Sequence, residues 1–443
     1  MGESNGLTVV NGIGELVTNC ADPNDPDAPM TTIGDLASIH AAALIIRDGR
    51  IAWAGPKEGL NAALDGLDDG ESTPHVIDLG GRTLIPGFVD SHSHLVFGGD
   101  RGDEFEARMS GQPYDGGGIM RTVRATRESG AAWLADHTAA LVAEARRQGT
   151  TTIEIKTGYG LDVDNEAKLA RVAALFTPEV TFLGGHAVPQ EYRGGADTGH
   201  PGGRDAYVRL VCGPMLDAVA ATGAARWVDV FCEPHSPFAF DGDETRAMIA
   251  AGVRAGLTPR LHGAQLGEGP GPMIAVEYDA ASVDHCTFLT DDDIDALAGT
   301  WNPGATADAI GGPAHGTVAT FLPAVEFSTK QPYPDMRRAI DAGAKVAIAS
   351  DCNPGTCFSD SIPFAIAIAV REMGLTPSEA LWAATAGGAL ALRRDDIGVI
   401  RVDAKADLAV VDAPSHAHIA YRAGVPLTHA LETLSPSLQR TGR

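Results

Sequence analysis

Between residues 83 and 391 the chain repeats one pattern: a short apolar run, a loop, and a stretch with apolar residues at helical spacing. Eight apolar runs are strand candidates, at residues 84–89, 151–155, 180–183, 227–231, 259–261, 282–284, 317–322 and 345–349. Helical spacing is clear over residues 131–147, where Leu134, Leu141 and Ala145 recur before Gly149 ends the run. Eight strand–helix units predict an α/β fold, a (β/α)8 TIM barrel.

The two ends of the chain carry a different pattern, of short β runs separated by turns. Near the N-terminus the runs cover residues 14–18, 42–46, 50–54 and 76–79, and residues 406–412 form a further strand candidate near the C-terminus. Residues 21–30, rich in Pro and Asp, predict a loop. We therefore expect β-rich segments at residues 1–83 and 393–443, with the barrel at residues 84–392 between them.

Polar residues follow the predicted strands in a way that matches this fold, because active sites of such barrels gather at the carboxyl ends of the strands. The residues are His92 and His94 after the first strand, Tyr159 after the second, His186 after the third, Glu233 after the fourth, His262 after the fifth, His285 after the sixth and Asp351 after the eighth. Five of the 14 histidines thus fall at strand ends. A random distribution of histidines along the chain would not place so many of them at strand ends.

This set of side chains predicts a metal centre. In an extended strand alternate side chains share a face, so His92 and His94 point the same way and can grip one ion. Together with His262 and Asp351 they form a set of imidazoles and one carboxylate that suits zinc or iron(II) in a catalytic site. Such an ion would lower the pKa of bound water from about 16 toward 7 and so supply hydroxide as a nucleophile. Asp351 would also take up the proton.

Two further imidazoles and a long loop complete the candidate site. Either His285 or His186 could polarise a carbonyl or donate a proton to a departing nitrogen; we favour His285 for this role and His186 for substrate contact. Residues 95–130 predict a glycine-rich loop long enough to act as a lid. Arg101 in this loop could pair with a substrate carboxylate, although alone it fits a surface arginine better.

Composition narrows the possible partners. The chain has 443 residues and a formal net charge of -25, which disfavours nucleic acid and an anionic membrane. No signal-like N-terminus and no apolar run of membrane-spanning length is present. Six cysteines without a Cys-x-x-Cys pair argue against a disulfide framework. We expect a cytoplasmic enzyme acting on a small molecule.

Several segments resemble a known family. They are the His92-Ser93-His94 block, Gly98-Gly99-Asp100-Arg101, Lys156-Thr157-Gly158-Tyr159-Gly160-Leu161-Asp162, and Asp351-Cys352-Asn353-Pro354-Gly355-Thr356. The first block is common to the amidohydrolase superfamily, whereas the other three together are specific to one family within it. Through them the chain resembles the imidazolonepropionases, the amidohydrolases of histidine degradation, over nearly its whole length.

The resemblance implies a TIM barrel with a small β-sandwich assembled from both chain ends, and a homodimer. It implies one zinc or iron ion held by His92, His94, His262 and Asp351. It also implies hydrolytic opening of 4-imidazolone-5-propanoate, a small anionic substrate, to N-formimino-L-glutamate. Substrate contacts would fall on Arg101, Tyr159, His186, Asn353, Gly355 and Thr356, with Arg101 and Tyr159 holding the propanoate.

Three features depart from the family pattern, one being that the stretch from Tyr159 to His186 is a few residues shorter than expected. Where some members have Glu, this chain has Gln265, whose neutral amide cannot act as a base and can only position substrate by hydrogen bonds. Residues 301–316, rich in Gly, Ala and Pro, form an apparent insertion before the seventh strand with no assigned role.

The sequence gives less support to three alternative functions or site types. A deaminase acting on a heterocyclic base would not need Arg101 as a carboxylate clamp. A catalytically silent scaffold would be free to lose ligands, yet the set is intact. A dinuclear site bridged by a modified lysine is disfavoured, because the fourth strand ends in Cys232-Glu233 and Lys156 lies on the second strand.

Overall fold

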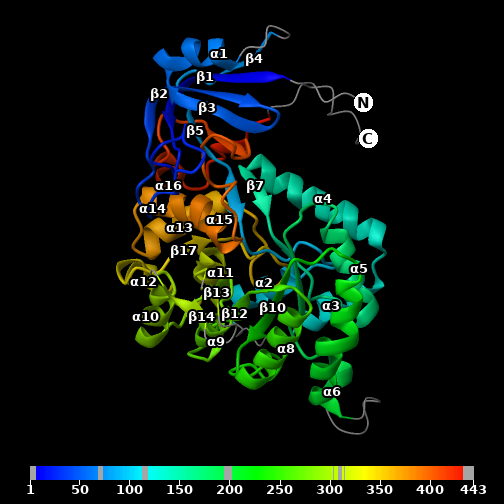
Figure 1. Cartoon of the computed structure of the whole chain (residues 1–443). Coiled ribbons are helices and arrows are strands. Elements are labelled where there is room, and N and C mark those ends of the chain that lie inside the picture. Colours follow the sequence, from blue (N-terminus) through cyan, green and yellow to red (C-terminus); the bar gives the residue numbers. More distant parts are fainter. Residues whose placement is uncertain are drawn as a thin grey trace.

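The computed structural model describes residues 6–67, 73–111, 118–193, 202–302, 304–307, 312–313 and 315–432, and within them strands from both chain ends pair in one sheet. Its seven strands are β1 (Leu7–Leu16), β2 (Ile39–Arg47), β3 (Arg50–Pro56), β4 (His75–Asp78), β5 (Thr83–Pro86), β18 (Leu408–Val411) and β19 (Thr428–Ala430). In Figure 1 the blue N-terminal strands lie near the red C-terminal segment at the top of the molecule. The β-rich ends predicted from the sequence therefore assemble together.

Strand β1 is the centre of this sheet. It begins at Leu7, earlier than residue 14 where the pattern predicted a strand. A bulge between Val10 and Ile13 divides it, so that its first half pairs with β4 and its second half with β5, while β2 covers its other edge. The β2–β3 hairpin turns at Asp48 and Gly49, which have φ values of 53° and 73°, the left-handed pair that tight hairpins require.

A second, parallel sheet forms the larger part of the molecule. Its strands are β8 (Ile155–Lys156), β9 (Val180–Gly185), β10 (Trp227–Cys232), β11 (Thr258–Pro259), β12 (Leu261–Gly263), β13 (Ser282–His285), β16 (Val318–Phe321) and β17 (Val346–Ile348). From β8 to β17 they pair in chain order, with β11 on β10. Strands β6 (Phe88–Asp90) and β7 (Thr150–Ile153) pair with each other in a separate parallel sheet. The larger sheet is curled, and hydrogen bonds from Asp351 N to His92 O and from His94 N to Cys352 O join the segments that follow β6 and β17.

Helices cover the outside of this curled sheet (Figure 1). They are α2 (Gly102–Met109), α3 (Ile119–Glu128), α4 (Ala131–Arg147), α5 (Val163–Ala173), α6 (Gly203–Leu210), α7 (Leu216–Ala220), α8 (Gly242–Arg254), α9 (Gly271–Glu277), α10 (Asp291–Gly299), α11 (Pro323–Thr329), α12 (Met336–Asp341), α13 (Ile362–Glu372), α14 (Pro377–Trp382) and α15 (Gly388–Ala391). Two short helices, α1 (Leu60–Leu67) and α16 (His418–Tyr421), come from the chain ends. The helix predicted over residues 131–147 is confirmed. In the part of the chain that the structure describes, no helix is both long and apolar enough to cross a membrane.

The apolar run at residues 84–89 is two strands and not the single one predicted. Strand β5 joins the sheet of the chain ends, whereas β6 pairs in parallel with β7, and Gly87 lies between them. A Cβ on Gly87 would lie 2.1 Å from Thr151 Oγ1, so the chain passes β7 too closely for any side chain. The predicted strand at residues 259–261 is likewise interrupted, at Arg260.

The predicted loop and the predicted insertion both contain regular elements. The loop expected over residues 95–130 carries α2 and α3, which leaves no continuous lid of that length. Of the three consecutive glycines in this segment, Gly116, Gly117 and Gly118, only Gly118 lies within the described residues. The insertion at residues 301–316 contains a small hairpin, β14 (Thr306–Ala307) with β15 (Gly312–Pro313).

Candidate active site

The segments after β6 and β17 bring Asp351 against the histidine pair. The two backbone hydrogen bonds that link these segments set Asp351 Oδ1 at 3.4 Å from His92 Nε2 and 3.2 Å from His94 Nε2. All three side chains are buried. Asp351 has φ of 49°, a left-handed conformation that is uncommon outside glycine and that recurs at functional sites.

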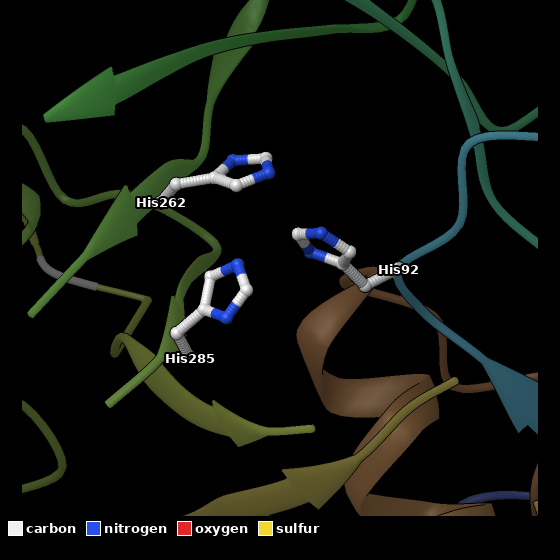
Figure 2. Close-up of side chains that lie close together, drawn as sticks. All are labelled: His92, His262 and His285. Carbon is white, nitrogen blue, oxygen red and sulfur yellow. The ribbon is translucent and has the colours of Figure 1, made fainter. Parts of the chain in front are cut away.

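Two more histidines reach the same point from adjacent strands. His262 lies on β12 and His285 on β13, and their rings face that of His92 (Figure 2), with centroids 4.5 Å and 5.7 Å from it. One ligand atom from each of these three residues falls within 4.8 Å of the others, as does one from each of His92, His94 and Asp351. The structure thus brings together every residue predicted to bind the metal.

The donor set fits a cation such as zinc or iron(II). Imidazole nitrogens and one carboxylate are the ligands these ions take in catalytic sites. Burial lowers the pKa of His94 to about 4, so this imidazole is neutral at pH 7, as a ligand must be. Although burial acts in the opposite direction, the adjacent His92 and His94 rings hold the pKa of Asp351 well below its usual range. Among the described residues, Nδ1 of buried His285 has no hydrogen-bond partner.

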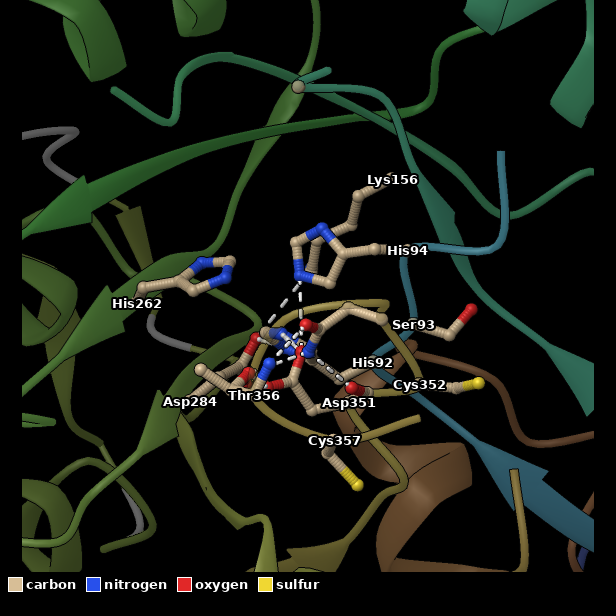
Figure 3. A network of polar contacts seen from close by, with 12 residues as sticks. His92, Ser93, His94, Lys156, His262, Asp284, Asp351, Cys352, Thr356 and Cys357 are labelled. Atoms are coloured by element: carbon tan, nitrogen blue, oxygen red, sulfur yellow. Dashed lines mark hydrogen bonds and ion pairs between the residues drawn. The ribbon is translucent and has the colours of Figure 1, made fainter. Parts of the chain in front are cut away.

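Two buried carboxylates lie against the Nδ1 atoms of His92 and His262. Asp284 Oδ2 lies 2.7 Å from His92 Nδ1, and Asp229 Oδ2 lies 3.0 Å from His262 Nδ1. A carboxylate at Nδ1 fixes the ring orientation and leaves Nε2 as the atom available to a metal. Figure 3 shows Asp284 with the ligand histidines and Lys156.

The cavity above the histidines is lined by most of the residues predicted to contact substrate. They are Arg101, Tyr159, His186, Gln265, Asn353 and Thr356, together with His94, His262, His285 and Asp351. The His186 ring stacks on that of His94 at a centroid distance of 5.2 Å, and Tyr159 lies 5.3 Å from His186. Of the predicted site residues, His92 and Gly355 are not part of this lining, and Gly355 lies beside Arg101.

His186 and Tyr159 are oriented by one loop. His186 Nδ1 lies 2.9 Å from Gly158 O, which can only accept, so Nδ1 carries the proton and Nε2 is an acceptor. Burial lowers the pKa of His186 well below its usual value, which keeps the ring neutral. The loop itself is held by buried Glu166, whose carboxylate accepts from the amides of Gly158, Gly160 and Leu161.

Arg101 is buried and has an internal partner. Its Nε and Nη2 both donate to Glu104 Oε2, at 3.0 Å and 2.7 Å. Gly355 packs against the other side of the guanidinium, where a Cβ would lie 2.2 Å from Nη1. The arginine is therefore a fixed feature of the cavity wall and not a surface residue.

The turn after β17 uses Asn353 internally. Its Oδ1 accepts from the amides of Gly355 and Thr356, and its Nδ2 donates to Asp351 O at 2.7 Å. These bonds shape the turn that carries Asp351. Direct contacts of Asn353 and Gly355 with substrate stay predictions.

Comparison with known proteins identifies the family. Residues 75–168 and 233–437 match models described as amidohydrolase family. The imidazolonepropionase of Mycolicibacterium smegmatis is 53% identical over 423 residues, which are 96% of this chain and 95% of that protein. The imidazolonepropionase of Salinispora tropica is 54% identical over 95% of each chain. This chain belongs to the imidazolonepropionase family.

Solved structures show how widely the fold of this imidazolonepropionase-family chain is shared. An adenosine deaminase from Xanthomonas campestris with bound zinc has a TM-score of 0.61 at 16% identity, covering 96% of this chain and 90% of that one. A mutant atrazine chlorohydrolase from Arthrobacter aurescens, complexed with zinc and atraton, has a TM-score of 0.61 at 14% identity, covering 93% and 91%. Identities this low establish the amidohydrolase fold only.

Sequence reasoning missed the buried charges behind the site. Asp229 lies within β10 and Asp284 within β13, and Arg260 lies between β11 and β12. Glu154 lies between β7 and β8, Lys156 ends β8, and all five side chains are buried. Their signal in the sequence was a charged residue inside an apolar strand, which is costly unless the charge has a partner. In this imidazolonepropionase-family fold the buried acidic and basic side chains pair with one another.

Proposed function

We propose that this protein hydrolyses 4-imidazolone-5-propanoate to N-formimino-L-glutamate, the third step of histidine degradation. One observation carries the proposal: in a chain more than half identical to curated imidazolonepropionases, a metal-ligand group and a buried arginine face one cavity. The metal group suits hydrolysis of a cyclic amide, and the arginine suits a carboxylate.

We assign one zinc or iron ion per chain to His92, His94, His262 and Asp351. The convergence of these buried donors supports the assignment. When bound, the ion supplies Lewis acidity that makes water nucleophilic at neutral pH. Everything else in the reaction falls to side chains of the chain itself.

Proton transfer is assigned to Asp351 and His285. Water adds to the ring carbonyl carbon, the carbon–nitrogen bond of the ring breaks, and the leaving nitrogen takes up a proton. Asp351 accepts the proton lost by the water. Burial lowers the pKa of His285 well below its usual value, so the neutral ring can hydrogen-bond to the carbonyl oxygen or pass a proton to nitrogen. His186 is the less suitable of the two, because its Nδ1 proton is already donated to Gly158 O.

Substrate binding is assigned to the remaining cavity residues. Arg101 and Tyr159 hold the propanoate, and His186, Gln265, Asn353, Gly355 and Thr356 surround the ring. Because the Gln265 amide is neutral, it orients substrate without exchanging a proton. Glu233 accepts from the backbone amides of Gln265 and Leu266 and so supports the loop that carries Gln265.

The finer architecture is part of the same proposal. We propose a closed (β/α)8 barrel that begins at Gly87 and a small β-sandwich built from both chain ends. The backbone hydrogen bonds between the segments after β6 and β17 support closure. A homodimer in the cytoplasm remains a prediction of the family resemblance and composition.

A spectrophotometric assay of substrate loss tests the function. We expect turnover of 4-imidazolone-5-propanoate and none of guanine or cytosine, which have no carboxylate for Arg101. Activity on a nucleobase alone would assign the chain to the heterocycle deaminases. In the same assay His285→Asn should lower kcat, whereas His186→Asn should mainly raise KM; the reverse pattern would exchange their roles.

A further inference from the structure

Two cations are completely buried beneath the histidines. Lys156 ends β8 and Arg260 lies between β11 and β12, and neither side chain is accessible to solvent. An unpaired charge in such a place would cost several kcal/mol. Each must therefore be held by groups of opposite charge or by carbonyl oxygens.

Their partners are the carboxylates that hold the ligand histidines. Lys156 Nζ lies 2.9 Å from Asp229 Oδ2 and 3.8 Å from Asp284 Oδ2. Arg260 Nη2 lies 3.3 Å from the same Asp284 oxygen and donates to Ser91 O at 2.6 Å, while Nη1 donates to Ala391 O at 2.8 Å.

The contacts form two chains, which Lys156 links because its Nζ also lies 3.8 Å from Asp284 Oδ2. One runs from Lys156 through Asp229 to His262, and the other from Arg260 through Asp284 to His92. Glu154, 3.1 Å from Lys156 Nζ, completes the surroundings of the lysine. Since Arg260 is also tied to two backbone carbonyls, it anchors its chain to the frame of the barrel.

We propose that Lys156 and Arg260 are positioning residues of the metal site. By fixing Asp229 and Asp284, they fix the ring direction and the Nδ1–H tautomer of His262 and His92, which turns both Nε2 atoms toward the ion. Outer partners of this kind typically change metal affinity 10- to 100-fold. The inference rests on the proposed ligands and not on the identity of the substrate.

Zn²⁺ affinity of the metal-free full-length protein tests the proposal, measured by competition with a chromophoric chelator. Lys156→Met and Arg260→Met should each weaken binding by roughly 10- to 100-fold. Matched controls are Lys168→Met, whose lysine donates to Ser129 O on the outside of the barrel, and Arg226→Met, whose arginine pairs with Glu179. Both controls should bind within about threefold of wild type, well inside the 10-fold minimum expected of the test variants.

Histidine ¹⁵N spectra of the metal-free protein provide a second readout. Wild type should show His92 and His262 protonated at Nδ1, and Arg260→Met and Lys156→Met should shift His92 and His262, respectively, toward mixed tautomers. Unchanged affinity and unchanged tautomers, with only a lower free energy of unfolding, would overturn the proposal and leave a structural role.

Conservative variants keep the test decisive if the methionine variants do not fold. Lys156→Arg and Arg260→Lys retain the charge but change its geometry, and we expect them to fold with intermediate Zn²⁺ affinity. Wild-type affinity in both would refute positioning. A wild-type protein that binds Zn²⁺ tightly but does not open imidazolonepropanoate would refute the proposed function alone.

Discussion

Arg101 Nη2 donates to Glu104 Oε2 over 2.7 Å, so the guanidinium assigned to the substrate carboxylate already has one carboxylate partner. Glu104 takes Nε and Nη2 through a single oxygen, which orients the planar group within the cavity wall. A lysine could not be held in this way, because its ammonium is a point charge on a flexible stem.

Arg101→Lys should therefore raise KM for imidazolonepropanoate roughly 10- to 100-fold with little change in kcat, since a hydrogen bond to a charged group contributes about 1.5–3 kcal/mol. Steady-state kinetics measure both constants. Arg371→Lys, on an exposed arginine paired with Glu372, is the matched control and should leave KM unchanged. Equal KM values for Arg101→Lys and wild type would show that Arg101 does not bind the substrate carboxylate.

Glu166 should control substrate affinity through the loop that carries Tyr159. Glu166→Ala leaves the buried amides of Gly158, Gly160 and Leu161 without their acceptor, at about 1–3 kcal/mol each. We expect a lower free energy of unfolding and a higher KM. Glu166→Gln, which keeps one acceptor oxygen, should lie between Ala and wild type in urea unfolding and in KM. A normal KM in Glu166→Ala would show that the loop is held by other contacts.

Glu326 should make stability depend on pH. It is buried on α11 with one hydrogen bond, from Thr287 Oγ1, and burial raises its pKa from 4.5 to about 7. The folded state then keeps a proton that the unfolded state has lost, so stability is highest below pH 4.5 and falls as the pH rises toward 7. The full decrease in the free energy of unfolding is about 3 kcal/mol, because each unit of pKa difference corresponds to about 1.4 kcal/mol.

Glu326→Gln removes this dependence, because its amide does not titrate. The variant should gain stability relative to wild type between pH 5 and pH 8, measured by urea unfolding at both values. Glu58→Gln, at an exposed position, should follow wild type at both. A constant difference between Glu326→Gln and wild type across this range would contradict a raised pKa.

Removal of metal should abolish activity and lower Tm. An ion that binds only the folded state stabilises it by about 4 kcal/mol at a concentration 1,000 times its Kd. Dialysis against a chelator followed by addition of Zn²⁺ or Fe²⁺ should restore both activity and Tm, and the more effective ion indicates the native one. Metal analysis should find about one ion per chain; two per chain would overturn the mononuclear assignment.

The sequence was sufficient for much of the fold because its signals are local. Helical spacing located α4 at its observed bounds, and short apolar runs located most strands to within a few residues. The polar residues at strand ends could be grouped without coordinates, since parallel strands present their carboxyl ends on one side of the sheet. This placed His92, His262 and Asp351 together before any distance was known.

Local patterns along the chain are thus enough to predict the order of elements and the identity of the residues around the metal. The three-dimensional fold is needed to see that residues 84–89 are divided at Gly87, because an apolar run does not specify which strands it pairs with. It alone decided that Lys156, Asp229 and His262 form one chain of contacts, and Arg260, Asp284 and His92 another. The members of each chain come from different strands, and closure of the curled sheet sets their distances, which no local pattern records.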